Sequence, residues 1–170
     1  MTDNNTVASA LELLDFFTSA ESENWSSGQF AADTFSFSAD TTIDNAVAAY
    51  PEERLKPALY MSRAKRTPKN TMVFYKRPRI NTQFDLSELS FDEDGKLCRA
   101  YFVQREPDVL SGRHKTDICF NAAKDFLIRT FGETQMTDSI KETEFTLPWG
   151  TVRLHRLLMS SPCYVTVLYN

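Results

Sequence analysis

Cysteine, histidine and clustered acidic side chains are the residues of this chain that could carry out catalysis or hold a metal ion. The three cysteines, Cys98, Cys119 and Cys163, lie far apart and form no CxxC pair. They therefore predict free, reduced thiols, not a zinc site or a disulfide. Cys119 lies in the first turn of a predicted helix, where the pKa of a thiol is lowered. His114 precedes that helix, and the two side chains could form a nucleophile–base pair. We expect instead that Cys119 fills a small gap in the core, as free cysteines commonly do.

The remaining chemical features also favour structural roles. Asp92, Glu93 and Asp94 are consecutive and close a predicted hairpin, where acids are ordinary turn residues, whereas calcium takes oxygens from a loop of defined spacing. His155 belongs to a predicted strand and is expected at the surface. The five glycines form neither a phosphate-binding loop nor a nucleophile elbow. The sequence thus predicts no catalytic residue, no cofactor and no metal.

The charge of the chain is divided into blocks. Residues 1–53 contain ten acids and no lysine or arginine, residues 54–79 contain nine basic residues and no acid, and the remainder contains thirteen acids and ten basic residues. The whole chain has a net charge of -4 and a pI of about 5.2. Such an asymmetry concerns the choice of partners and not the fold.

The basic block predicts a binding surface. We expect residues 63–79 to form an electropositive patch, with Arg63, Lys65, Arg66, Lys69, Tyr75, Lys76, Arg77 and Arg79 as its binding residues. An exposed aromatic ring among cations can stack on a base while the cations hold phosphates, but the net negative field of the molecule repels nucleic acid. The competing interpretation is a solvated connector that the acids of residues 1–53 neutralise, within the chain or across a homodimer.

Periodicity and turn residues predict the elements that position these residues. Helices are expected at 7–20, 43–50, 52–63 and 117–131, and extended segments at 29–40, 71–76, 82–91, 96–104, 140–147, 151–159 and 163–169. Asp94-Gly95 predicts a hairpin turn, and Gly132 predicts a helix C-terminus. Within 117–131, we expect Ile118, Ala122, Phe126 and Leu127 to face the core.

This element order predicts one α+β domain over residues 1–170, with helices packed on one face of an antiparallel sheet. The order also suggests two α-β-β-β units, over 41–105 and 116–170, that share a layout without residue identity. It resembles that of small inhibitor and envelope-assembly proteins built from such units. The resemblance concerns element order alone and transfers no residue.

The sequence predicts neither a secretory signal nor a membrane span. No segment approaches the ~18 to 20 apolar residues of a membrane span, and the N-terminal stretch has no basic residue. Together with free cysteines, these features predict a cytoplasmic protein that does not associate with membranes.

The sequence therefore predicts a small intracellular binding or adaptor protein without enzymatic activity, of the inhibitor, immunity or chaperone kind. Its partner would be an acidic protein surface or a small anionic ligand. One alternative is a small-molecule-binding or enzymatic fold whose aromatic-lined pocket has His114 or Asp117 at its edge. The other is a nucleic-acid-binding protein that uses residues 63–79.

Overall fold

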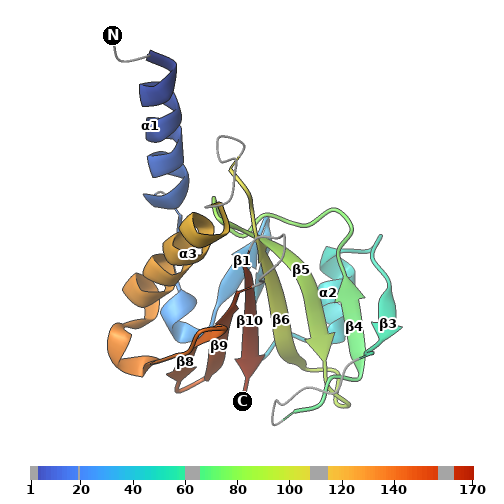
Figure 1. Cartoon of the computed structure of the whole chain (residues 1–170). Helices are drawn as coiled ribbons and strands as arrows, with labels where there is room; N and C mark the ends of the chain where they lie inside the picture. Colours follow the sequence, from blue (N-terminus) through green and yellow to red (C-terminus); the bar gives the residue numbers. More distant parts are fainter. Residues whose placement is uncertain (1–3, 19, 60–65, 108–114, 157–162) are drawn as a thin grey trace.

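The computed structural model describes residues 4–18, 20–59, 66–107, 115–156 and 163–170 (Figure 1). Its helices are α1 (Asn4–Thr18), α2 (Ile43–Ala49) and α3 (Lys115–Phe131), with short 3-10 turns η1 (Trp25–Ser27) and η2 (Glu133–Gln135). Its strands are β1 (Phe30–Ala32), β2 (Phe35–Phe37), β3 (Leu55–Pro57), β4 (Asn70–Val73), β5 (Phe84–Phe91), β6 (Leu97–Gln104), β7 (Met136–Asp138), β8 (Glu142–Leu147), β9 (Gly150–His155) and β10 (Tyr164–Tyr169).

Eight of these strands form one antiparallel sheet, which confirms the predicted α+β class. The strand order is β3-β4-β5-β6-β10-β9-β8-β7, and β1 and β2 form a separate hairpin. The central pair joins β6 to β10, with Phe102 opposite Val165 and Ala100 opposite Val167. Each half of the sheet, one ending at β6 and the other at β10, holds four strands in mirrored order, which is how two similar units would meet through their last strands. Each side has one strand more than the three that the sequence suggested.

The hydrophobic core lies between one face of the sheet and the elements that cover it. Trp25 is 3% exposed, and its ring contacts Phe30, Phe84, Phe102 and Phe126 at centroid distances of 4.9 to 6.1 Å. These rings come from η1, the hairpin, the sheet and α3, so one tryptophan joins four parts of the fold. Aromatic rings in such contacts add to the stability that their burial provides.

The predicted helix over 52–63 is wrong within its described part. Leu55–Pro57 forms the edge strand β3 and pairs with residues 70–72 of β4, while residues 60–65 lie outside the described ranges. Pro57 lacks a backbone N–H, which the edge of a sheet tolerates and a helix interior does not. β7 at the opposite edge was not predicted either.

Helix α3 forms as predicted, but its orientation differs from the expectation. The residues that face the core are Cys119, Phe120, Ala123, Phe126, Leu127 and Phe131. Ile118 is 39% exposed and Ala122 is only half-buried, so two of the four predicted core residues lie off the buried face. The reason is that α3 carries two adjacent apolar lines, and periodicity alone does not say which of them meets the sheet.

Helix α1 extends away from the body of the protein (Figure 1). Its C-terminal end is attached to residues 82–83, where Thr82 Oγ1 donates to the Phe16 carbonyl at 3.1 Å and Gln83 Nε2 donates to the Phe17 carbonyl at 3.1 Å. These two carbonyls belong to the last turn, where a helix has no partners of its own. Among the described helices, none has both the length and the apolar character that a membrane crossing would require.

Candidate functional site

The predicted basic patch is divided by strand β4. Arg66 and Lys69 precede the strand, whereas Tyr75, Lys76, Arg77 and Arg79 follow it; Arg63 and Lys65 lie outside the described residues. Because four residues of a strand span about 13 Å, the two groups lie at opposite ends of β4. The two groups are therefore separated along the strand.

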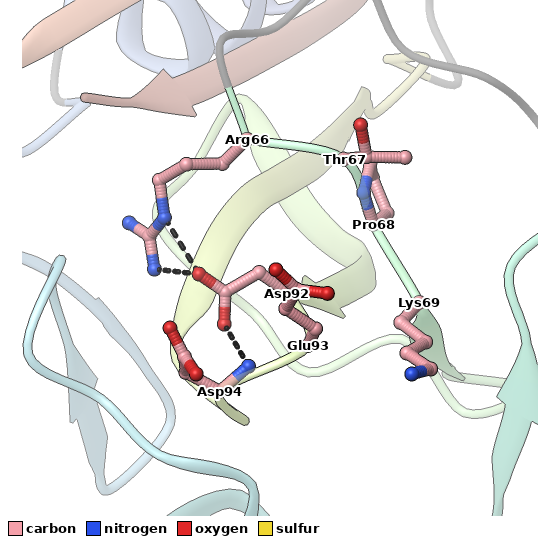
Figure 2. Close-up of a pocket in the computed structure, with 7 residues that line it drawn as sticks. All are labelled: Arg66, Thr67, Pro68, Lys69, Asp92, Glu93 and Asp94. Atoms are coloured by element: carbon pink, nitrogen blue, oxygen red, sulfur yellow. Dashed lines mark hydrogen bonds and ion pairs between the residues drawn. The ribbon is translucent and has the colours of Figure 1, made fainter.

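The group before β4 borders a charged recess of about 650 Å³ (Figure 2). The recess is lined by Arg66, Thr67, Pro68, Lys69, Asp92, Glu93 and Asp94. Arg66 donates from Nε and Nη2 to Asp92 Oδ2 at 2.8 and 2.6 Å, and Figure 2 shows the guanidinium turned toward that carboxylate. Arg66 is thus paired within the chain, and Lys69 is the exposed cation of this group.

Asp92 has a structural role in the β5–β6 turn. Its Oδ1 accepts hydrogen bonds from the backbone N–H groups of Asp94 at 3.1 Å and Lys96 at 2.9 Å. Burial alone would raise the pKa of Asp92, but these bonds and the Arg66 guanidinium outweigh it and hold that pKa below its usual value. Within the described ranges, no group of three histidine, cysteine or acidic side chains could hold a metal ion.

The group after β4 forms, with one residue of β3, the surface that we call the basic cluster: Lys56, Tyr75, Lys76, Arg77 and Arg79. Tyr75 is 78% exposed. Lys56 Nζ donates to the Tyr75 hydroxyl at 2.8 Å and lies 5.0 Å from the centre of its ring. In the part of the chain that the structure describes, no carboxylate lies within 4 Å of the charged group of Lys56, Lys76, Arg77 or Arg79.

A second recess of about 310 Å³ lies beside the basic cluster. It is lined by Asp33, Ala49, Tyr50, Pro51, Glu52, Glu53, Phe74, Lys76 and Pro78. Three of these residues are acids of the N-terminal block, so part of that block does lie near the cluster. The Asp33 carboxylate accepts a hydrogen bond from the backbone N–H of Arg79 at 3.3 Å, not from its side chain. The competing interpretation requires that these acids neutralise the basic block. In the described structure they lie near the basic cluster but form no ion pair with it.

The cysteines are free and buried, as the sequence predicted. Burial raises the pKa of the Cys119 thiol, and the nearby Glu106 carboxylate acts in the same direction. Burial also raises the pKa of Cys98 to about 11 and that of Cys163 to about 12. Such thiols are protonated at neutral pH and are poor nucleophiles. His114, the proposed base, lies outside the described residues.

We expect a thiol titration of the denatured, unreduced protein to count three thiols per chain, one for each cysteine. The native protein should react slowly with the same reagent, because all three thiols are buried. A count of one in the denatured protein would mean that a disulfide forms and that the assignment of free thiols is wrong.

The aromatic residues that could have lined a pocket pack mainly against one another. Phe30 lies 5.3 Å from Phe102 between ring centroids, and Phe131 lies 5.6 Å from Phe145. Asp117, suggested as a residue at the edge of a pocket, forms an ion pair with Arg156. These aromatic residues therefore belong to the packed core.

Sequence reasoning did not find the polar network on the sheet face opposite the core. Arg153 contacts Glu144 and Glu142 at 2.5 and 3.8 Å, and His155 contacts Glu142 at 3.0 Å and Thr166 at 3.1 Å. Burial, with a contribution from Arg153, lowers the pKa of His155 although Glu142 opposes the change. Arg153 and His155 alternate with the buried residues of β9 and so share one face, but cross-strand register is needed to pair them with residues of β8 and β10.

Comparison of the chain with protein-family models, with curated proteins and with solved structures finds no match.

Proposed function

We propose that this protein is a non-enzymatic adaptor that binds an acidic protein surface through the basic cluster. The observation that supports this is the exposed Tyr75 ring among cations whose charged groups have no carboxylate within 4 Å in the described structure. The Asp85 carboxylate interacts with Arg79 and Arg77 only at longer distance. Tyrosine and arginine are enriched at protein interfaces, because a rigid ring and a planar guanidinium gain contact area at low entropic cost.

The surroundings of the basic cluster favour a protein partner. β3 is a short edge strand with Lys56 at its centre, and Leu59, just beyond it, is 87% exposed. An acidic segment with an apolar residue would find both a cation and an apolar contact here. The position of Lys56 and Pro57 discourages the addition of a further strand, so side chains are expected to mediate the contact.

Nucleic acid is the second candidate, because Tyr75 could stack on a base. Two features weigh against it. Arg66 forms an ion pair with Asp92, and the remaining cations of residues 66–79 lie at both ends of β4. A phosphate backbone requires a continuous basic track, and the net charge of the chain is -4.

The proposal is tested with two labelled probes of equal length and charge, a polyglutamate peptide and an oligo-dT strand. We expect the peptide to bind more tightly, and Lys76→Glu/Arg77→Glu to weaken it by about tenfold or more, because charge reversal acts on steering and affinity together. The melting midpoint should change little, since exposed ion pairs contribute about 0 to 1 kcal/mol. Fluorescence anisotropy at two salt concentrations measures binding.

The matched control is Lys96→Glu/Lys141→Glu, which reverses two exposed lysines outside the basic cluster. It changes the net charge equally and should leave peptide affinity within about twofold of wild type. Equal losses in the two double variants would show that only net charge matters and would refute the basic cluster as a site. Tighter binding of oligo-dT would replace the adaptor by a nucleic-acid-binding protein.

A further inference from the structure

An arginine that sequence reasoning did not select extends the basic cluster onto the sheet face opposite the core. Arg105 directly follows β6, and its Nε lies 3.7 Å from Oδ2 of Asp85 on β5. Asp85 alternates along β5 with Phe84 and Leu86, which are fully buried in the core. Because successive side chains of a strand point to opposite faces, the Asp85 carboxylate lies on the face away from the core.

Arg79 of the basic cluster lies beside the same aspartate, on the other side of β5. Residues 77–80 run alongside β5, where Arg79 forms a β-bridge with Asp85 and the Leu86 N–H donates to the Pro78 carbonyl at 2.8 Å. Residues that pair across antiparallel segments project their side chains to the same face. Since β6 pairs with the opposite edge of β5, arginines approach this carboxylate from both of its neighbours.

The charges of these residues act on one another. Burial raises the pKa of Asp85, whereas the guanidinium groups of Arg79 and Arg77 act in the opposite direction. The Asp33 carboxylate is also near enough to contribute to the increase. Three positive charges therefore lie near two negative ones. We call Arg77, Arg79 and Arg105 the arginine site.

The guanidinium groups of the arginine site keep their hydrogen-bond donors available. Within the described ranges, none of these side chains donates a hydrogen bond, and Arg79 donates to Asp33 only from its backbone. The contact of Arg105 with Asp85, at 3.7 Å, is an ion pair beyond hydrogen-bond distance. Each guanidinium has five N–H donors in a planar fork. The arginine site thus combines an excess of positive charge with many donors that lack acceptors in the described structure.

Such donors match a phosphoryl group better than a carboxylate. A phosphorylated side chain has three acceptor oxygens and a charge of about −1.5 to −2 at neutral pH, whereas a carboxylate has two oxygens and a single charge. Arginine binds phosphate oxygens through pairs of parallel hydrogen bonds. Asp85 already brings one carboxylate to the arginine site and leaves the donors unused. The remaining donors therefore suit an anion with more oxygens and more charge.

We propose that the arginine site binds a phosphorylated side chain of the partner protein, within the acidic segment that occupies the basic cluster. This inference rests on the proposed function and names the group that the partner presents. Because Arg77 and Arg79 belong to both surfaces, one segment can contact Tyr75 and place its phosphate beside Arg105. Recognition of phosphorylated motifs by clustered arginines is a common mode of peptide binding.

The experiment compares two labelled peptides of equal length and charge. One is polyglutamate, and in the other two glutamates are replaced by one phosphoserine and one serine. We expect the phosphopeptide to bind the full chain at least about tenfold more tightly. Arg105→Lys keeps the charge but removes the planar fork, so it should reduce that preference to about threefold or less. It should leave polyglutamate affinity within about twofold of wild type. Fluorescence anisotropy measures both affinities.

The matched control is Arg129→Lys, the same exchange at an exposed arginine of α3, which should leave both affinities unchanged. Equal binding of the two peptides by the wild type, or equal effects of the two lysine variants, would overturn the proposal. Inorganic phosphate that competes at the same concentration as the phosphopeptide would reduce the arginine site to a site for free phosphate. Oligo-dT that binds more tightly than the phosphopeptide, and loses this in Arg105→Lys, would replace the partner protein by nucleic acid.

The two peptides also separate this inference from the proposed function. If polyglutamate binds through the basic cluster and the phosphopeptide binds no more tightly, the phosphate site alone is wrong. If only the phosphopeptide binds, and its binding depends on Arg105, the phosphate site is correct and an unmodified acidic surface is not the partner. If neither peptide binds, both proposals are wrong.

Discussion

Replacing Phe126 by alanine is expected to lower the free energy of unfolding by about 3 to 5 kcal/mol, the usual cost of removing a buried phenylalanine. Phe126 is 3% exposed, and its ring meets Trp25 edge-on at 5.1 Å and Phe84 at 5.8 Å. Its loss leaves a void where α3 meets both η1 and the sheet, and neighbours that hold one another in place refill such a void poorly. Urea unfolding followed by circular dichroism measures the change.

The control for this experiment is Ile118→Ala on the same helix. Ile118 is 39% exposed, so we expect a change below about 1 kcal/mol. Comparable losses in the two variants would contradict the orientation of α3 and would place Ile118 in the core, where the sequence alone had suggested it.

Replacing Asp92 by alanine is expected to lower the free energy of unfolding by about 2 to 3 kcal/mol at neutral pH. The variant loses charge-assisted bonds to Arg66 and to the backbone of Lys96 and Asp94, and such bonds to charged groups are the stronger ones. The Asp92 carboxylate also holds the β5–β6 turn together through its bonds to the backbone. Its removal should therefore appear in hydrogen exchange mainly as faster exchange of the amides of the β5–β6 hairpin.

The Asp92 effect should depend on pH in a defined direction. The pKa of Asp92 is lower in the folded protein than its ordinary value of 3.8, so the unfolded chain binds the proton more readily. The stabilisation is therefore complete above about pH 4 and is lost as the pH falls through the folded pKa. The difference between wild type and Asp92→Ala should shrink in acid, while Glu93→Ala, at an exposed position, should cost little at any pH. A difference that stays constant into strong acid would contradict this role.

The sequence predicted those elements whose signals are local. Thr42 caps α2 through a capping box with Asn45, Gly95 adopts a φ of 73° in the β5–β6 turn, and Gly132 adopts a φ of 89° after α3. In each case the residue type itself carries the conformational preference. The order of these elements was sufficient to predict an α+β fold with one large antiparallel sheet.

The parts that the sequence did not predict depend on contacts between distant residues. β3 and β7 are three-residue strands that exist only because a neighbouring strand pairs with them. The pairing of Arg66 with Asp92 joins positions 26 residues apart, and it gives a predicted binding residue a partner within the chain. Charge counts along the chain show that a basic block exists, but not that a strand divides it or which cations remain available.

The place of β10 in the sheet has a consequence for how the protein folds. β10 lies between β6 and β9, so until Tyr164–Tyr169 is in position each of those strands has an unpaired edge. The segment from β6 to β10 closes a long loop, and such non-local pairing is slow to form. Unpaired edges of this kind promote association between incompletely folded chains. We therefore expect refolding yield to fall steeply with protein concentration, and a synthetic peptide of residues 163–170 to compete for the central position during refolding.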